Sequence, residues 1–317
     1  MASEEPIELS VVTVSPDGLG PIEETLAALR AQSEADRMEL VVVAPREVPA
    51  NAESLAGFGT TRQVAVGEIE TLAPAIAAGM RAATGPVVAY AEEHSFPEPG
   101  WASALIERHR GPWAAVAWSL ENANSKTLTS WAHLLADFGP AVAPVRSGER
   151  RGALPWHHVS YKREELLARS DRLEQLLETE ALLHEELLAQ GRRIYLEGGA
   201  ASRHLNVSRL RPHLASHLFE GRAWGAARAH SRSWSRARRL AYALAFPLVP
   251  LVRLKRLLPD VRRVRARSGR RWGLIPRLGL SLAADALGEA VGYLWGSGRS
   301  RQRLLTIELE RQSHMSD

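Results

Sequence analysis

Short apolar runs rich in β-branched residues alternate with helix-patterned segments in this 317-residue chain, and this alternation limits the fold more than any other feature. Residues Ile7 to Val14 and Glu39 to Ala44 are typical of strands, the second of the kind that is buried on both faces of a parallel sheet. Ile22 to Gln32, between them, repeats apolar residues at helical spacing. Strands that alternate with helices predict βαβ units and hence a doubly wound α/β domain.

The same pattern continues further along the chain. Periodicity predicts a helix over Leu72 to Ala83, a strand over Gly85 to Ala91 and a helix from about Trp101 to Arg110. Leu173 to Gln190 is typical of one long helix, and Gly191 stands in the position after a helix that favours glycine.

Polar side chains follow the predicted strand Gly85 to Ala91 directly. The loop there reads AEEHSFPEPGW, so Glu92, Glu93 and His94 stand at the carboxyl end of the strand. Because ligands of doubly wound sheets bind beyond the carboxyl ends of the strands, these residues predict an acidic functional site. Adjacent glutamates are also typical of a solvated helix start, where they favour the helix dipole.

The absence of cysteine narrows the chemistry of such a site. It excludes disulfides, thiolate metal sites and cysteine nucleophiles, so any metal must be held by oxygen or imidazole ligands. Residues 1 to 6 are acidic where a secretory signal peptide would be basic and then apolar, which predicts a cytoplasmic N-terminus.

Composition changes beyond Val207, which predicts a domain over residues 1–207 and a basic and apolar helical tail over residues 208–317. The net charge of +4 hides an excess of arginine from Arg203 onward. Leu240 to Val252 is an apolar run between two arginines, shorter than the ~20 residues that span a bilayer and interrupted by two prolines. An interfacial or re-entrant helix fits this run better.

A second apolar segment, Trp272 to Trp295, follows a basic stretch that ends at Arg271. Gly288, Gly292 and Gly296 lie four residues apart in it, a stripe of small residues that lets two helices approach closely. The two apolar segments predict a shallow membrane hairpin, because aromatic rings and arginines suit the headgroup region. The alternative is a pair of amphipathic helices that pack on the domain.

The order of these elements resembles the family 2 glycosyltransferases of GT-A fold. The resemblance covers residues 7 to 207 and rests on GPVVAYAEEHSFPEPGW, on the helix that ends in LLAQG, and on His204 thirteen residues after Gly191. It implies a GT-A doubly wound mixed sheet, here with a C-terminal membrane-interfacial extension. It also implies an inverting, hexosyltransferase-type enzyme that uses a nucleoside diphosphate sugar. The acceptor would be a glycan or a lipid-linked molecule of the bacterial cell surface, reached from the cytoplasmic face of the membrane.

The resemblance also implies a metal site that serves the donor diphosphate. Glu92, Glu93 and His94 occupy the Asp-rich positions of the family, where oxygen ligands hold a divalent cation, Mn²⁺ or Mg²⁺, that neutralises the diphosphate. It implies Glu93, His94 and His204 as metal ligands, with Glu93 the leading one. Glu92 and His158 are then contacts to the nucleotide sugar.

The catalytic base of the family is acidic and lies in the helix before the Gly191-like turn. Register counted back from Gly191 places it at Glu180, or at Glu178 if the register slips by two. An inverting transferase needs this base to take the proton of the acceptor hydroxyl as it attacks the anomeric carbon.

One departure from the family concerns the nucleotide base. Ala44 stands where the family generally has the aspartate that reads the uracil ring, and Asp17 and Glu47 are the nearest polar replacements. This departure favours an alternative, a non-catalytic GT-A-like scaffold at the membrane. A third hypothesis is an arginine-rich tail that binds nucleic acid. We expect no nucleic-acid partner, because long apolar stretches interrupt the arginines.

Overall fold

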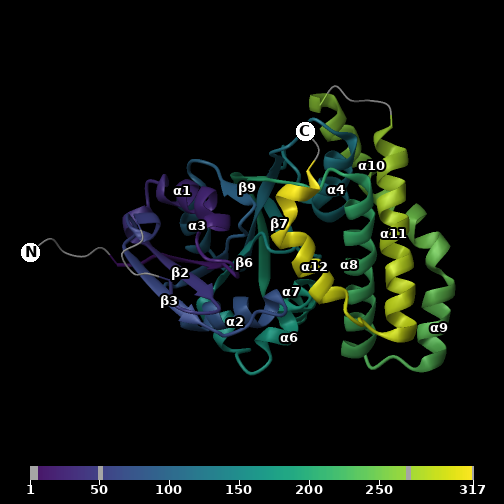
Figure 1. Ribbon diagram of the computed structural model, residues 1–317, viewed down its shortest axis with the longest axis horizontal. Coiled ribbons are helices and arrows are strands. Elements are labelled where there is room, and N and C mark those ends of the chain that lie inside the picture. Colours follow the sequence, from purple (N-terminus) through teal and green to yellow (C-terminus); the bar gives the residue numbers. More distant parts are fainter. Residues whose placement is uncertain (1–5, 49–52, 269–272, 316–317) are drawn as a thin grey trace, which may run out of the picture. The chain divides into compact units, whose positions relative to one another are not determined.

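The computed structural model describes residues 6–48, 53–268 and 273–315, which form two compact units (Figure 1). The sheet unit is Met1–Glu121 with Ala143–His204, and the helical unit is Asn122–Val142 with Leu205–Asp317. Residues 122–142 therefore group with the C-terminal helices, whereas the sequence predicted a single boundary at residue 207. Residues 1–5, in the acidic start, and 269–272, at the junction of the predicted basic and second apolar segments, lie outside the described residues.

The sheet unit is built on one mixed sheet, to which the described residues contribute nine strands. They are β1 (Leu9–Val14), β2 (Met38–Ala44), β3 (Thr60–Ala65), β4 (Val87–Tyr90), β5 (Ser95–Pro97), β6 (Trp113–Asn122), β7 (Gly148–Arg150), β8 (Val159–Lys162) and β9 (Arg193–His204). Their order is β3-β2-β1-β4-β8-β6-β9-β5, with β7 paired to β9. β1 is parallel to β2 and β4, whereas β8 is antiparallel to β4 and β6.

Helices cover both faces of this sheet. They are α1 (Glu23–Arg30), α2 (Leu72–Ala82), α3 (Trp101–His109), α5 (Arg163–Leu167), α6 (Leu173–Leu177) and α7 (Glu180–Ala189). Figure 1 shows α1 and α3 on one side of the sheet and α2 and α6 on the other. β1 and β2 are consequently buried along their whole length, as their apolar sequences predicted. Parallel pairing puts the carboxyl ends of β1, β2 and β4 at one edge.

The segment Leu173 to Gln190, predicted as one helix, is broken into α6 and α7. Thr179 between them is not helical, with φ −153° and ψ 81°. Glycine and proline are absent at the break, which instead accompanies a buried contact: Oε2 of Glu180 accepts a hydrogen bond from the backbone N–H of His157 at 2.9 Å. Tertiary contacts of this kind override local helix propensity. Gly191 follows α7 with φ +76°, as predicted.

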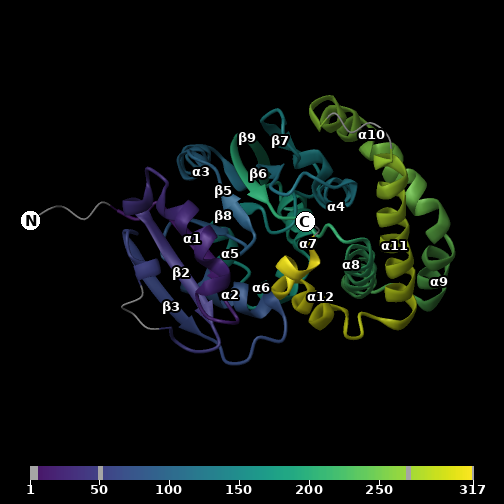
Figure 2. The same ribbon diagram turned by 45° about the horizontal axis from the view of Figure 1, so that its top comes forward.

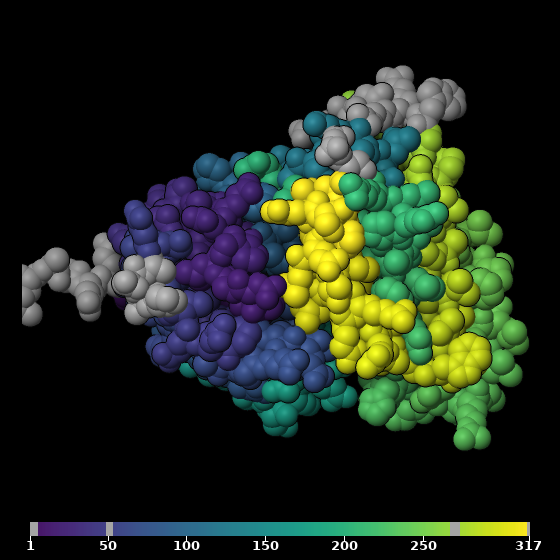
Figure 3. Space-filling model, in the orientation of Figure 1, coloured from purple at the N-terminus to yellow at the C-terminus, as the bar shows by residue number. Residues whose placement is uncertain are grey.

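The helical unit packs its helices around α11. They are α4 (Leu128–Phe138), α8 (Leu210–Ser231), α9 (Arg236–Leu244), α10 (Val249–Ser268), α11 (Leu274–Trp295) and α12 (Ser300–Leu309). Figures 1 and 2 show α8, α11 and α9 side by side, and Figure 3 shows α12 at the surface of this unit against α8. Among the described residues, no helix combines the length and the apolar character needed to cross a bilayer.

Two glycines of α11 let it approach α8 closely. A Cβ atom at Gly288 would lie 2.2 Å from the carbonyl oxygen of Leu218, and one at Gly292 would lie 2.2 Å from that of Arg222. The predicted close helix pairing is thus confirmed for these two glycines, and the partner helix belongs to the same chain. Gly296 instead follows the end of α11, with φ +74°.

The apolar run Leu240 to Val252, predicted as an interfacial or re-entrant helix, is divided among three helical segments. It comprises the end of α9, a 3-10 turn at Phe246–Leu248 and the start of α10. Pro247 lies in that turn, where its ring disfavours helical geometry for the residue before it. The run is therefore not one straight helix.

Candidate functional site

Glu92 lies among four imidazoles in the sheet unit. Its Oε1 is 2.5 Å from Nδ1 of His157. Its Oε2 lies 3.4 Å from Nε2 of His94, 3.3 Å from Nε2 of His158 and 3.5 Å from Nε2 of His204. We refer to these five residues as the Glu92 group. All of them are buried, with Glu92 the most exposed at 7%.

Three strand ends supply the Glu92 group. Glu92 and His94 follow β4, His157 and His158 precede β8, and His204 is the last residue of β9. β5 pairs with β9 so that Ser95 lies opposite His204, which brings the loop after β4 to the end of β9. The hydroxyl of Thr25 on α1 lies 3.1 Å from the carbonyl oxygens of both Glu92 and Glu93, and so holds the same loop from the other side.

The charge of this site follows from its burial and its imidazoles. Burial would raise the pKa of Glu92, but the surrounding imidazoles, among them His94, His158 and His157, bring that pKa well below 4.5. Burial lowers the pKa of His158 well below 6.5. Glu92 is therefore an anion at neutral pH, and His158 is a neutral imidazole.

Glu93 contacts the Glu92 group through His94. Its Oε1 lies 3.2 Å from Nδ1 of His94, and the other ring nitrogen, Nε2, is 3.1 Å from Nε2 of His204. A carboxylate on the far nitrogen of an imidazole is the arrangement that orients metal-ligating histidines. The geometry favours Glu92 as the carboxylate ligand of the metal and Glu93 as the carboxylate that orients His94. The sequence favoured Glu93 as the ligand.

The Glu92 group fits a divalent metal ion. Ligands that bind zinc tetrahedrally at ~2.0 to 2.2 Å are roughly 3.3 to 3.6 Å apart, and Nε2 of His158 and of His204 lie 3.3 and 3.5 Å from Oε2 of Glu92. One ligand atom from each of these three residues lies within 4.8 Å of the others. A donor set of imidazole nitrogens and one carboxylate oxygen favours a transition metal over Mg²⁺.

Glu180 reaches the Glu92 group through His157. Its Oε2 accepts the backbone N–H of His157, whose ring contacts Glu92. Burial raises the pKa of Glu180 to about 7, although the charge and the backbone N–H of His157 act in the opposite direction. A carboxyl group that titrates near neutral pH suits a general base. Contacts thus connect the sequence-predicted residues in one network, which is buried except for the half-buried Glu93: Glu92, Glu93, His94, His158, Glu180 and His204.

Sequence reasoning missed His157. Its φ of +59° is uncommon for a residue other than glycine, and such a backbone persists where surrounding contacts hold it. The ring lies edge-on to Tyr90, with centroids 5.0 Å apart, and beside Trp156, with centroids 4.0 Å apart. The available signal was the pair of histidines before a strand, of which the sequence reasoning used only His158.

Asp17 and Glu47 lie outside the Glu92 group. Asp17 is an exposed turn residue after β1, and Glu47 is exposed in the loop after β2. Both loops begin at the carboxyl edge of the sheet, because β1 and β2 are parallel. Ala44 is the last residue of β2 and is buried. A role of Asp17 or Glu47 toward a nucleotide remains a prediction.

The sequence matches no protein-family model and no curated protein. A solved structure of the mannosyltransferase PcManGT from Pyrobaculum calidifontis, in complex with GDP-Man and Mn²⁺, superposes with a TM-score of 0.57. It is 15% identical, and the match covers 92% of this chain and 88% of that one. S. aureus TarS (residues 1–349) in complex with UDP has a TM-score of 0.48 at 14% identity, over 98% and 92% of the two chains. The first likeness shows that the chain has the GT-A fold, a mixed α/β sheet followed by a helical C-terminal region.

Proposed function

We propose that this protein is a glycosyltransferase that moves a sugar from a nucleoside diphosphate sugar to a glycan or lipid-linked acceptor. The observation that carries the proposal is the connection of Glu180 to the Glu92 group by way of His157, at the carboxyl edge of a GT-A sheet. A buried base close to a buried anion-and-imidazole site supplies the two parts that sugar transfer needs. The GDP-Man and Mn²⁺ bound by PcManGT support the same class of donor and cofactor.

In this reaction an acceptor hydroxyl oxygen forms a bond to the anomeric carbon, and the bond from that carbon to the diphosphate oxygen breaks. Glu180 takes the hydroxyl proton, and the electron pair of the broken bond leaves with the nucleoside diphosphate. Attack opposite the leaving group inverts the anomeric configuration. Its pKa of about 7 keeps Glu180 partly ionised at neutral pH and so able to accept the proton.

The Glu92 group would hold the divalent cation. Glu92, His158 and His204 would supply the inner donors, and His94, which contacts Glu93, lies beside the same carboxylate oxygen. A bound Mn²⁺ or other transition-metal ion would supply positive charge to the departing diphosphate.

The proposal is tested with the purified full-length protein and a panel of UDP-, GDP- and dTDP-sugars with Mn²⁺ or Mg²⁺. We expect at least one donor to raise the melting temperature in the presence of metal and to be hydrolysed slowly. Glu180→Gln should keep donor binding and lose turnover, whereas Glu185→Gln, an exposed glutamate of the same helix, should keep both. If no donor in the panel binds or is turned over, the enzyme proposal is wrong.

The absence of the base-reading aspartate at Ala44 motivates the second candidate, a non-catalytic scaffold. Convergence of the acidic, histidine and base positions on one buried network favours the enzyme instead, because a scaffold needs no such network. Donor binding without turnover of donor by the wild type would favour the scaffold.

An apolar face on α9 and α10 motivates the proposal that the protein acts at an anionic membrane surface on the cytoplasmic side. Leu240, Leu244, Leu248 and Leu251 are spaced three or four residues apart and are at least half exposed, Leu244 by 71%. Exposed cations flank them: Arg236, Arg238, Lys255 and Arg256. Leucines between cations match a headgroup surface, where apolar side chains insert and cations meet lipid phosphates.

Vesicle flotation tests the membrane proposal. We expect the full-length protein to bind vesicles with anionic lipid, and Leu244→Glu with Leu251→Glu to abolish binding. Leu309→Glu, at an exposed leucine of α12, is the control and should bind like the wild type. Salt-sensitive retention on a nucleic-acid column without vesicle binding would contradict the proposal and support the nucleic-acid alternative.

A further inference from the structure

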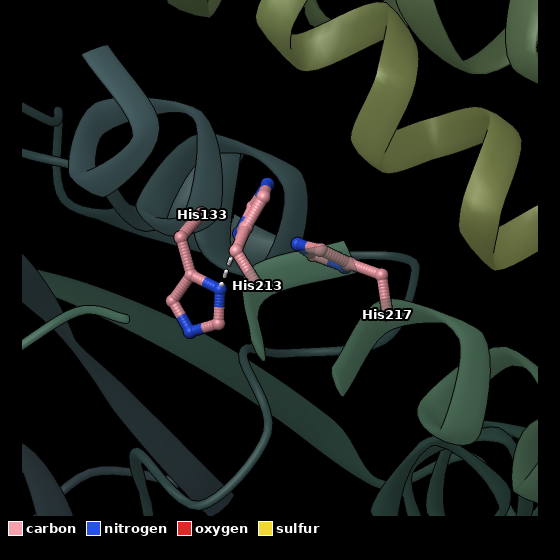
Figure 4. A group of neighbouring side chains, drawn as sticks. All are labelled: His133, His213 and His217. Atoms are coloured by element: carbon pink, nitrogen blue, oxygen red, sulfur yellow. Dashed lines mark hydrogen bonds between the residues drawn. The ribbon is translucent and has the colours of Figure 1, made fainter. Parts of the chain in front are cut away.

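Three histidines meet inside the helical unit. His133 comes from α4, and His213 and His217 come from successive turns of α8, as Figure 4 shows. They are 2%, 0% and 0% exposed, and one ring nitrogen of each lies within 4.8 Å of the others. We refer to them as the three-histidine group. Burial of three imidazoles at one point needs a partner for their ring nitrogens, since an unpaired buried polar group destabilises a fold.

The outer nitrogens of His133 and His213 have such partners. Nε2 of His213 lies 2.7 Å from Oγ of Ser281, which itself donates to the carbonyl oxygen of Arg277, so that Nε2 carries the proton. Nε2 of His133 lies 3.5 Å from a carboxylate oxygen of Asp137. In His213 the proton therefore belongs on the outer nitrogen, and an ionised Asp137 favours the same tautomer in His133.

The inner nitrogens then face each other as two lone pairs. Nδ1 of His133 is 3.2 Å from Nδ1 of His213 (Figure 4). Two acceptors at that distance repel unless a proton or a cation lies between them. Their separation is close to the roughly 3.3 Å between two nitrogens that bind one zinc ion at ~2.0 Å.

His217 supplies the third nitrogen. Neither of its ring nitrogens makes a hydrogen bond within the described residues, although the side chain is fully buried. Its Nδ1 lies 3.4 Å from Asp285 and 3.5 Å from Asp137, so Nε2 is the nitrogen that Figure 4 shows turned toward the other two rings. A histidine that binds a metal through one ring nitrogen typically contacts a carboxylate through the other, and His217 has this arrangement.

Acidic side chains surround His217. Asp137, Glu220 and Asp285 all lie within 4.0 Å of its Nδ1, and Arg253 approaches Asp285 at 3.7 Å. Carboxyl groups at the outer nitrogen of a histidine hold its ring in place for a metal ligand at the other nitrogen.

We propose that Nδ1 of His133, Nδ1 of His213 and Nε2 of His217 bind one zinc ion, which holds α4 to α8. Imidazole nitrogens are typical zinc ligands. Residues 143–204 separate residues 122–142 in sequence from the rest of the helical unit, so a cross-link between α4 and α8 would hold that segment to the unit.

Metal analysis of the full-length protein tests this site. Wild type purified after expression with zinc should carry one zinc equivalent more per chain than His213→Gln or His217→Gln. His230→Gln, at an exposed histidine of the same helix, is the matched control and should keep the wild-type content. Because the Glu92 group is intact in all four proteins, any metal held there cancels in the comparison.

Chelation keeps the test informative if the variants fold poorly. EDTA should lower the melting temperature of the wild type, and zinc should restore it. After replacement by Co²⁺, the visible absorption per chain should be equal in wild type and His230→Gln and lower in His213→Gln by the contribution of one cobalt ion. Equal metal content in all four proteins, or a wild type whose melting temperature is indifferent to EDTA and zinc, would overturn the proposal in favour of a protonated His217 paired with Asp137 and Asp285.

Discussion

Nδ1 of His157 lies 2.5 Å from Oε1 of Glu92, and the backbone N–H of the same histidine donates to Glu180. One residue thus joins the carboxylate of the candidate metal site to the candidate base. His157 is held with φ +59° between Tyr90 and Trp156, so its position is set by packing and is not adjustable at low cost. The distance between base and metal site is therefore built into the fold.

Glu92→Gln and Glu93→Gln should lower the metal affinity to different extents, because Glu92 is the inner ligand and Glu93 orients His94. Loss of an orienting carboxylate such as Glu93 costs about 10- to 100-fold in metal affinity. Glu92 faces three imidazoles with Oε2, so its replacement should cost more than that. Titration of each variant with Mn²⁺, followed by electron paramagnetic resonance, measures the order. A larger loss in Glu93→Gln would return Glu93 to the leading position that the sequence favoured.

Turnover should depend on pH through Glu180. Its pKa is raised to about 7, chiefly by burial, so the base is half ionised there and about one-tenth ionised one pH unit lower. We expect kcat/KM to fall about tenfold per pH unit below 7. Glu180→Gln should lower kcat by about 10²- to 10⁴-fold and remove this dependence. Glu178→Gln should leave both unchanged. If Glu178→Gln gives the loss instead, the base lies two residues earlier.

The parallel half of the fold could be predicted because its signals are local. β1, β2, α2 and β4 are short segments with strong periodicity, and each was predicted within a few residues of its bounds. The loop after β4 was recognisable because carboxylates follow a buried strand directly. The break between α6 and α7 could not be predicted, because it depends on the contact of Glu180 with His157, 23 residues away in sequence.

The partners inside each site could not be predicted for a related reason. Sequence spacing places Glu92, Glu93 and His94 at a strand end but does not say which side chain points inward. His133, in the middle of an apolar helix, is 80 residues from His213, and only packing of α4 against α8 brings the two rings together. The glycine stripe predicted close helix packing, whereas only the structure identifies α8 as the partner of α11.

Acid should destabilise the sheet unit through two buried histidines. Burial lowers the pKa of His109 and of His184 from 6.5 to about 3 in the folded protein. Below pH 6.5 these histidines bind protons in the unfolded chain but not in the folded protein. The free energy of unfolding therefore falls between pH ~6.5 and ~3, by up to about 1.4 kcal/mol per pH unit for each histidine. Glu180 acts in the opposite sense between pH 4.5 and about 7, because its raised pKa stabilises the fold at low pH.

Variants isolate the histidine contribution from that of Glu180. Urea unfolding at several pH values measures how the free energy of unfolding depends on pH. This dependence should be weaker for His109→Gln than for the wild type, because the variant takes up at most one proton fewer on unfolding. His230→Gln, at an exposed position, should follow the wild type. Parallel curves for His109→Gln and wild type would mean that His109 titrates normally in the fold.

Replacement of two glycines of α11 by alanine should change the stability of the protein in opposite directions. A Cβ at Gly288 would lie 2.2 Å from the backbone of Leu218, so Gly288→Ala must push α8 and α11 apart, and overpacking of this kind costs about 1 to 3 kcal/mol. Gly279 has no atom within 4 Å of the corresponding position, so Gly279→Ala should stabilise α11 by about 0.5 to 1 kcal/mol through helix propensity. Chemical denaturation of the two variants beside the wild type measures both effects. Equal stability of the two variants would mean that α8 and α11 do not pack through these glycines in solution.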